Sequence, residues 1–161
     1  MSGVAPNDLA AHPFTSGLTS EQLGRLALVA ISVEAPAGHR FFEEGGPATS
    51  MWLISTGRVA LDLRVPGREP LILETLGPGD ELGLSWLSPP RQWQFGAQAQ
   101  LSVSALELDC AAVLSLCESD HELGYQISRR LLSTAISRLQ AARIRMLDLY
   151  GPPAARTGSA S

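Results

Sequence analysis

Few side chains in this sequence have the types and spacing that chemistry requires. The most suggestive stretch runs from Gly79 to Leu87, where Asp80 and Glu81 form a carboxylate pair on a predicted turn. We expect this pair to be solvated rather than catalytic. The three histidines lack metal-ligand spacing with carboxylates or thiols, and the sequence has no nucleophile elbow or Walker loop. We therefore predict that the protein is not an enzyme and holds no metal or other cofactor.

The two cysteines are the remaining reactive groups. Cys110 and Cys117 lie seven positions apart, which on a helix places them about 10 Å apart along the axis. That distance is too long for a disulfide within one helix, so we expect buried free thiols. Two cysteines are also too few for a four-cysteine iron–sulfur site.

Composition limits the class of protein. A length of 161 residues suits a single domain, and 45% hydrophobic with 17% charged residues is typical of a folded globular chain. A net charge of −4 disfavours nucleic acid as a partner. No apolar run approaches the roughly 18 residues of a membrane span, and the N-terminus lacks the features of a signal peptide. We expect a cytoplasmic protein with no membrane contact.

The elements that must position any site follow from the pattern of apolar residues and turns. Thr19 is a predicted cap for a helix that runs to about Ala30. Residues 32–109 alternate apolar and polar side chains in short segments closed by Gly or Pro, which predicts an antiparallel barrel or jelly roll. Asp109 is a predicted cap for a short helix, and a long helix is expected over about residues 120–150. We expect residues 1–11 to form a flexible lead and residues 151–161 a disordered tail.

This order of elements resembles the cyclic nucleotide-binding domain of the catabolite-activator (Crp/Fnr-like) family. The resemblance covers residues 12–150 and includes the Gly79-Asp80 turn and Gly83. It implies a mainly β fold with flanking helices: an eight-stranded antiparallel jelly roll followed by a long C-terminal dimerisation helix. In that family, a glutamate after the turn accepts hydrogen bonds from the ribose hydroxyl, and an arginine nine residues later pairs with the cyclic phosphate.

Both polar anchors of the family are replaced here. Leu84 stands at the glutamate position and Trp93 at the arginine position, with a predicted strand starting at Ala97 to fix the register. Since a buried phosphate needs an arginine and oriented amides, we expect a cyclic nucleotide to bind weakly or not at all. Arg91 could substitute only if its loop shifted. The candidate residues of this degenerate pocket are Gly83, Leu84, Ser85, Trp86, Arg91 and Trp93.

Two interpretations of the apolar residues at the pocket remain open. They either fill the vacated space or form a site for an apolar ligand or a docking protein. We expect Trp93 to lie inside, where the phosphate-binding arginine would be, and Trp86 to lie nearer the surface as part of a docking face.

The long helix carries a heptad pattern of apolar residues at alternating spacings of three and four. The pattern predicts a parallel homodimer, although such a stripe also suits packing on the helix's own domain. Only 11 residues follow Tyr150, too few for a helix-turn-helix DNA reader. The predicted dimer residues are Leu132, Ala135, Leu139, Ala142, Met146 and Leu149.

The sequence thus predicts a dimeric sensor or regulatory domain with a degenerate nucleotide pocket. It would act through contact with another protein or through an unidentified ligand. One alternative is an accessory subunit of a multi-subunit redox enzyme such as a hydrogenase. Another is a true cyclic-nucleotide receptor that uses Arg91.

Overall fold

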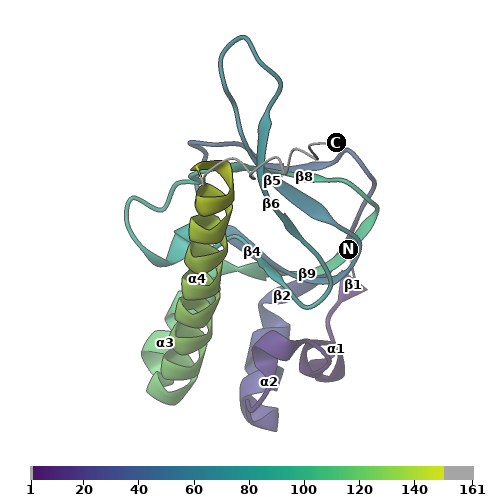
Figure 1. The fold of residues 1–161 in the computed structure, drawn as a ribbon. Helices are drawn as coiled ribbons and strands as arrows, with labels where there is room; N and C mark the ends of the chain where they lie inside the picture. The colour runs from purple at the N-terminus through teal and green to yellow at the C-terminus, as the bar shows by residue number, and fades with distance from the viewer. Residues whose placement is uncertain (1, 151–161) are drawn as a thin grey trace, which may run out of the picture.

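A computed structural model describes residues 2–150 as a β jelly roll flanked by helices (Figure 1). Within those residues, antiparallel strands form a five-stranded sheet in the order β1-β2-β9-β4-β7 and a four-stranded sheet in the order β3-β8-β5-β6. The predicted fold class is therefore confirmed. The strands are β1 (Ser2–Gly3), β2 (Ala30–Ala35), β3 (Arg40–Phe42), β4 (Ser50–Thr56), β5 (Val59–Leu63), β6 (Leu71–Leu76), β7 (Glu81–Leu82), β8 (Gly96–Ala99) and β9 (Val103–Asp109).

The core lies between the two sheets. β4 and β9 are its central pair, with Leu53 opposite Leu106 in the register. Alternation along a strand sends every second side chain to the inner face, and β4 also buries residues of its other face under neighbouring elements. The result is one continuous apolar cluster that both sheets share with the helices.

Six helical segments accompany the sheets in the described chain. Two of the predicted caps are present: the Thr19 side chain accepts a hydrogen bond from the Gln22 N–H, and the Asp109 carboxylate accepts one from the Ala111 N–H. The segments are α1 (Pro6–Ala10), η1 (Pro13–Thr15), α2 (Ser20–Leu28), α3 (Cys110–Ser119) and α4 (His121–Tyr150). A further single turn, η2, spans Ser85–Leu87.

The N-terminal segment differs from the flexible lead expected over residues 1–11. β1 pairs with β2 through Ser2 and Ser32, and α1 places the fully buried Leu9 in the core. The hydroxyl of Thr15 donates to the main-chain oxygen of Leu9. One apolar side chain at the right point of α1 is enough to anchor the segment, and an isolated Leu carries no periodic signal in the sequence.

The two cysteines lie on α3, where Cys110 is buried and Cys117 is half-buried, and both are free thiols. Burial is the main cause that raises the pKa of both thiols, with nearby carboxylates adding to it. A raised pKa favours the protonated thiol, whereas the thiolate is the form that acts as a nucleophile or binds a metal. In the described chain, no helix is long and apolar enough to cross a membrane.

A partly buried ion pair links two strands of the small sheet on which the site is built. The guanidinium of Arg40 on β3 donates to the carboxylate of Asp62 on β5, with an Nη2–Oδ1 distance of 3.0 Å. The strand between them is β8, and a Cβ at Gly96 would collide with the Arg40 guanidinium. Glycine at this position therefore allows the pair to form across the strand.

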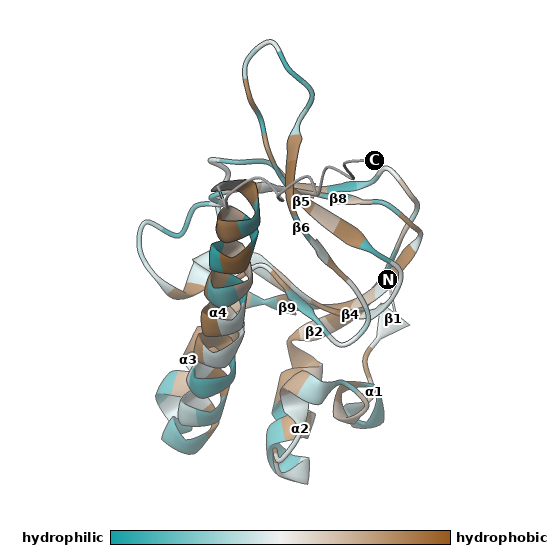
Figure 2. Ribbon diagram, in the orientation of Figure 1, coloured by the Kyte–Doolittle hydropathy of each residue, from teal (hydrophilic) through white to brown (hydrophobic). Residues whose placement is uncertain are grey.

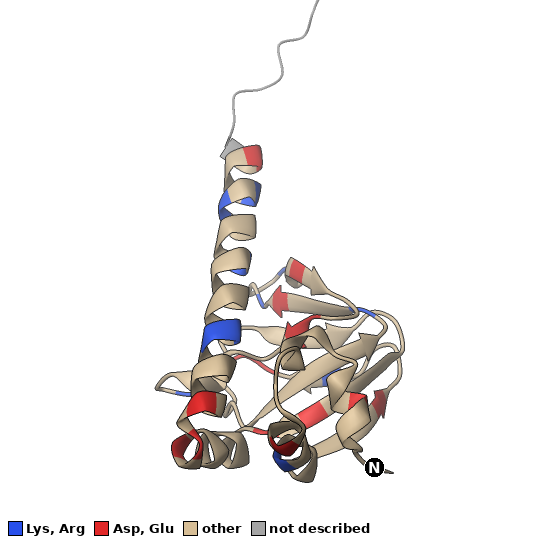
Figure 3. Ribbon diagram, turned by 90° about the horizontal axis from the view of Figure 1, so that it is seen from below, with Lys and Arg blue, Asp and Glu red and all other residues tan. Residues whose placement is uncertain are grey.

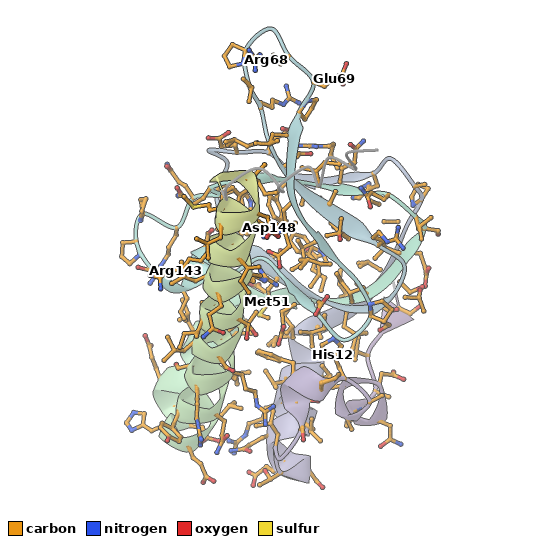
Figure 4. All side chains as sticks on the ribbon, viewed as in Figure 1. His12, Met51, Arg68, Glu69, Arg143 and Asp148 are labelled. Carbon is orange, nitrogen blue, oxygen red and sulfur yellow. The ribbon has the colours of Figure 1, made fainter. Side chains whose placement is uncertain are left out.

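His12 joins the N-terminal helices to the turn before β7 and is almost fully buried (Figure 4). Its Nδ1 accepts a hydrogen bond from the main-chain N–H of Phe14 at 3.1 Å. Burial lowers the pKa of His12 below its usual value, although nearby carbonyl oxygens and Asp80 partly oppose the shift. The folded state thus holds the imidazole neutral.

We expect stability to fall in weak acid because of His12. The unfolded chain takes up the proton more readily than the folded chain does. The stabilising contribution of the neutral His12 ring to the free energy of unfolding is therefore present above about pH 6.5. It is lost as the pH falls through the lower pKa of the folded state. The check is urea unfolding at about pH 7 and about pH 5 for the wild type and for His12→Asn, which keeps an acceptor and does not titrate. A pH dependence equal in both proteins would contradict the assignment.

Candidate functional site

A cavity of about 620 Å³ opens between the small sheet and the C-terminal half of α4. Its walls come from three places that are distant in the sequence. β5 and β6 form one wall, residues 83–85 and 93–95 form the floor and one side, and residues 135–149 of α4 form the other wall. Figure 1 shows α4 running beside the roll toward the end where β5 and β6 meet their hairpin. Most of the lining residues are apolar.

Trp93 forms part of the cavity floor and is held firmly from behind. Its indole stacks on Phe42, with ring centroids 3.8 Å apart and planes 10° from parallel. Its main-chain N–H donates to Gly46 at 2.8 Å, and its carbonyl accepts from Gly45 at 2.8 Å. Trp52 continues the aromatic cluster at 5.8 Å from Phe42. Trp93 is only 5% exposed, so it acts as a fixed apolar wall.

The indole of Trp93 also covers the Gly83 turn. Gly83 has a φ of +93°, and a Cβ added there would lie 2.9 Å from Cη2 of Trp93. Glycine is therefore required both by the left-handed backbone and by the close approach of the ring. The space in front of this turn is occupied by carbon, not by a cation.

Leu84 and Ser85 follow the turn and also line the cavity. Leu84 is the residue before η2, and it packs partly buried against the core. Its side chain offers no hydrogen-bond acceptor, so Ser85 and the nearby Gln94 supply the uncharged polar side chains of the lining.

The structure corrects the expectation that Trp86 lies near the surface. Trp86 is 1% exposed and belongs to the core, and it is not among the residues that line the cavity. Because η2 is a single tight turn, successive side chains point in different directions. Leu87, at 38% exposed, is the apolar side chain that points outward. The sequence offered two adjacent apolar residues and no signal for which of them is buried.

Arg91 lies on the exposed loop that precedes Trp93. Its main-chain N–H donates to Ser88 at 3.0 Å and its carbonyl accepts from Ala48 at 2.9 Å. It is not among the lining residues of the cavity. Hydrogen bonds thus hold the main chain of Arg91 in the loop, and its side chain lies outside the cavity.

The arginines that line the cavity come from α4, a contribution that the sequence analysis missed. Arg138 donates to the main-chain oxygen of Glu81 and so ties α4 to β7. Burial lowers the pKa of Arg138, while the charges of Glu74 and Glu81 nearby oppose the shift. Burial also raises the pKa of Glu81, which accepts from the Thr134 hydroxyl at 3.3 Å. Within residues 2–150 Arg138 forms no ion pair, and its guanidinium is held by the Glu81 carbonyl with the two carboxylates nearby.

Arg145 is the other cation in the lining. It lies two turns beyond Arg138 on an exposed stretch of α4. Within residues 2–150 it forms no ion pair. Figure 3 shows that the C-terminal part of α4, with basic residues on it, extends beyond the body of the roll.

The six predicted dimer residues are divided between two directions on α4. All except Leu132 line the cavity, although Leu139, Met146 and Leu149 remain more than half exposed. Further exposed apolar residues of α4 do not line the cavity and so lie on its outward side. Figure 2 shows apolar segments, in brown, along the length of this helix. These residues, missed by the sequence analysis, are Ile136 (47%), Ile144 (60%) and Leu147 (71%).

A heptad pattern that keeps Leu132 and Leu139 but takes Ile136 in place of Ala135 would have found part of this outward side. Ile136 lies four residues after Leu132 and three before Leu139, so it satisfies the same spacing as Ala135. Arg143 interrupts the register that contains Ile136, which is why the other register was the more regular one.

Comparisons with known proteins point to one family. Residues 32–120 match the family model described as the cyclic nucleotide-binding domain. A CRP-like cAMP-activated global transcriptional regulator of Mycobacterium tuberculosis is 29% identical over 117 residues, which is 73% of this chain and 50% of the regulator. The chain thus spans about half the length of the curated relatives it matches.

Solved structures agree in fold. A putative cyclic nucleotide-binding protein from Geobacter metallireducens superimposes with a TM-score of 0.75 at 25% identity, covering 84% of this chain and 98% of that one. The catabolite activator protein of Thermus thermophilus superimposes with a TM-score of 0.67 at 23% identity, covering 85% and 62%.

Proposed function

Because this chain belongs to the cyclic nucleotide-binding domain family, we propose that it is a dimeric regulatory sensor whose pocket no longer recognises a cyclic nucleotide. The observation that carries the proposal is the position of Trp93. The ring lies against the Gly83 turn, and aromatic packing on Phe42 holds it there. A cyclic phosphate at that turn would meet an apolar ring in place of a cation.

The energetics support the same conclusion. A charge-assisted hydrogen bond contributes about 1.5–3 kcal/mol, and both polar anchors that relatives of this family use are apolar here. Arg91 is disfavoured as a replacement for the missing charge, because it lies on an exposed loop whose main chain is hydrogen-bonded and it is not among the residues that line the cavity. Burying the ligand's phosphate without a partner would add a further cost.

Dimerisation through α4 is the second part of the proposal. A row of apolar side chains on the outward side of this helix is exposed, and a folded chain rarely leaves so many together in contact with water. The occupant we propose is the same helix of a second copy. The same surface would also suit a different protein partner, such as the enzyme subunit considered above. The net charge of −4 favours a protein partner over nucleic acid.

We expect cyclic AMP and cyclic GMP to bind at least about a hundredfold more weakly than a site with both anchors, because several kcal/mol of recognition is missing. Isothermal titration calorimetry on the purified chain measures this directly. A dissociation constant in the low micromolar range for either nucleotide would overturn the proposal.

The double variant Leu84→Glu with Trp93→Arg is the matched gain-of-function test. It restores the acceptor and the cation that relatives of this family carry, so nucleotide affinity should rise. Trp93→Ala alone is the control, since it opens the space and adds no charge. If both variants gained the same nucleotide affinity, the Trp93 ring would oppose binding only by occupying space, and the missing charge would not matter.

A further inference from the structure

We propose that the cavity between the small sheet and α4 binds an amphipathic carboxylate, with its apolar chain on Trp93 and its carboxylate at Arg145. This inference deepens the proposed function and rests on it, because it names the ligand class of the same sensor pocket. It excludes a cyclic nucleotide as the natural ligand.

The volume and the walls support an apolar ligand body. Trp93 fills the region of the Gly83 turn, yet about 620 Å³ remains beyond it, which falls within the usual range for small-molecule sites. The space is bounded by Leu61 of β5, Leu84, Phe95 and Leu139 of α4. Phe95 remains 41% exposed, so an apolar ligand would remove further surface from water.

The charged residues that line the cavity indicate that the ligand has one anionic end. Three charged residues line the cavity: Glu74, Arg138 and Arg145. Arg138 is buried, donates to the Glu81 carbonyl and has the charge of Glu74 close by, so its guanidinium is already engaged within the fold. Arg145 is left without an ion pair in residues 2–150. A carboxylate suits its planar guanidinium.

The other polar side chains are too few for a nucleotide. Besides the charged groups, Ser85 and Gln94 are the polar side chains among the lining residues of the described chain. A ribose and a purine need more partners than these two side chains supply, whereas a hydrocarbon chain needs none.

The position of Arg145 gives the ligand a regulatory consequence. Arg145, Ala142 and Met146 lie on α4, while Leu61 and Leu84 lie on the roll. A ligand that contacts both walls at once would hold the C-terminal half of α4 against the roll. Since α4 is also the proposed dimer helix, occupancy would bias the dimer.

The test uses decanoate as the probe and 1-decanol as its neutral counterpart, titrated by calorimetry into the delipidated full chain. We expect decanoate to bind. Arg145→Gln should weaken decanoate by at least about tenfold and leave decanol unchanged, because only the charged hydrogen bonds are lost. Arg143→Gln is the matched control: it lies on the side of α4 away from β5 and β6, and should bind as the wild type does (Figure 4).

A second variant fills the cavity from α4. Ala142→Trp, checked for folding by circular dichroism, should abolish binding of both probes. The inference is overturned if decanoate does not bind, if Arg145→Gln binds it as tightly as the wild type, or if Ala142→Trp has no effect. It is also overturned if decanoate affinity falls steadily as dimer forms, since a second copy of α4 would then occupy the cavity. The proposed function fails separately, through tight binding of cyclic AMP or cyclic GMP.

Discussion

Replacing Trp86 by alanine should lower the free energy of unfolding by about 3–5 kcal/mol, the largest loss we expect from any single side chain near the pocket. Trp86 is 1% exposed and is the bulkiest fully buried side chain of the described chain. Its removal loses a large apolar contact area and leaves a cavity that η2, held between β7 and the loop, has little freedom to close. Urea unfolding followed by circular dichroism measures the change.

Two further variants separate packing from the indole N–H. Among residues 2–150, the buried Nε1 of Trp86 finds no hydrogen-bond partner. Trp86→Phe removes that unpaired donor while it keeps most of the ring, so its loss should be well below that of Trp86→Ala. Leu87→Ala, at the exposed neighbour, should change stability by less than about 1 kcal/mol. A Trp86→Ala protein as stable as Leu87→Ala would contradict the buried position of the ring.

Placing an aspartate at Ile136 should convert the proposed dimer into monomers. Ile136 is 47% exposed on the single chain and does not line the cavity, so the substitution leaves the ligand site intact. In a dimer joined by α4, it would bury one unpaired carboxylate in each copy. A buried uncompensated charge costs about 3–5 kcal/mol, so the dissociation constant should rise by at least about a hundredfold.

Sedimentation velocity over a series of protein concentrations reads out this change. Gln100→Asp adds the same charge on an exposed turn outside α4 and should remain dimeric. Leu139→Asp should also yield monomers, but Leu139 lines the cavity as well, so Ile136→Asp is the cleaner test. A wild type that sediments as a monomer at micromolar concentration, or an Ile136→Asp protein that stays dimeric, would rule out α4 as the interface.

The length of α4 explains why its C-terminal half needs a partner, which the Ile136→Asp variant tests. A helix of 30 residues spans about 45 Å and depends on tertiary packing for its stability. Its first half is packed in the chain itself, with Leu123, Ile127 and Leu131 all buried. Beyond Arg138 the helix has only the cavity on one side. A partner on the outward side would supply the packing that this half lacks.

Local physical chemistry let the sequence determine most of the fold. Short alternating segments closed by Gly or Pro define strands wherever they occur, and caps such as Thr19 and Asp109 act within one helical turn. The replacement of both family anchors, by Leu84 and Trp93, was equally readable because it depends on residue type at a fixed distance from a turn. None of these features needs knowledge of what packs against them.

Only the tertiary structure decided which apolar side chains face the cavity. Spacing shows that Trp86 and Leu87 are both apolar, but their burial depends on the orientation of η2 against the core. A helical repeat likewise fits two registers on α4, containing Ala135 or Ile136, and the contact with the roll selects which one faces the cavity. The lining cation Arg145 lies more than fifty residues from Trp93 in sequence. Such pairings arise from packing over the whole chain, because a periodic pattern fixes a face of an element and not its neighbour.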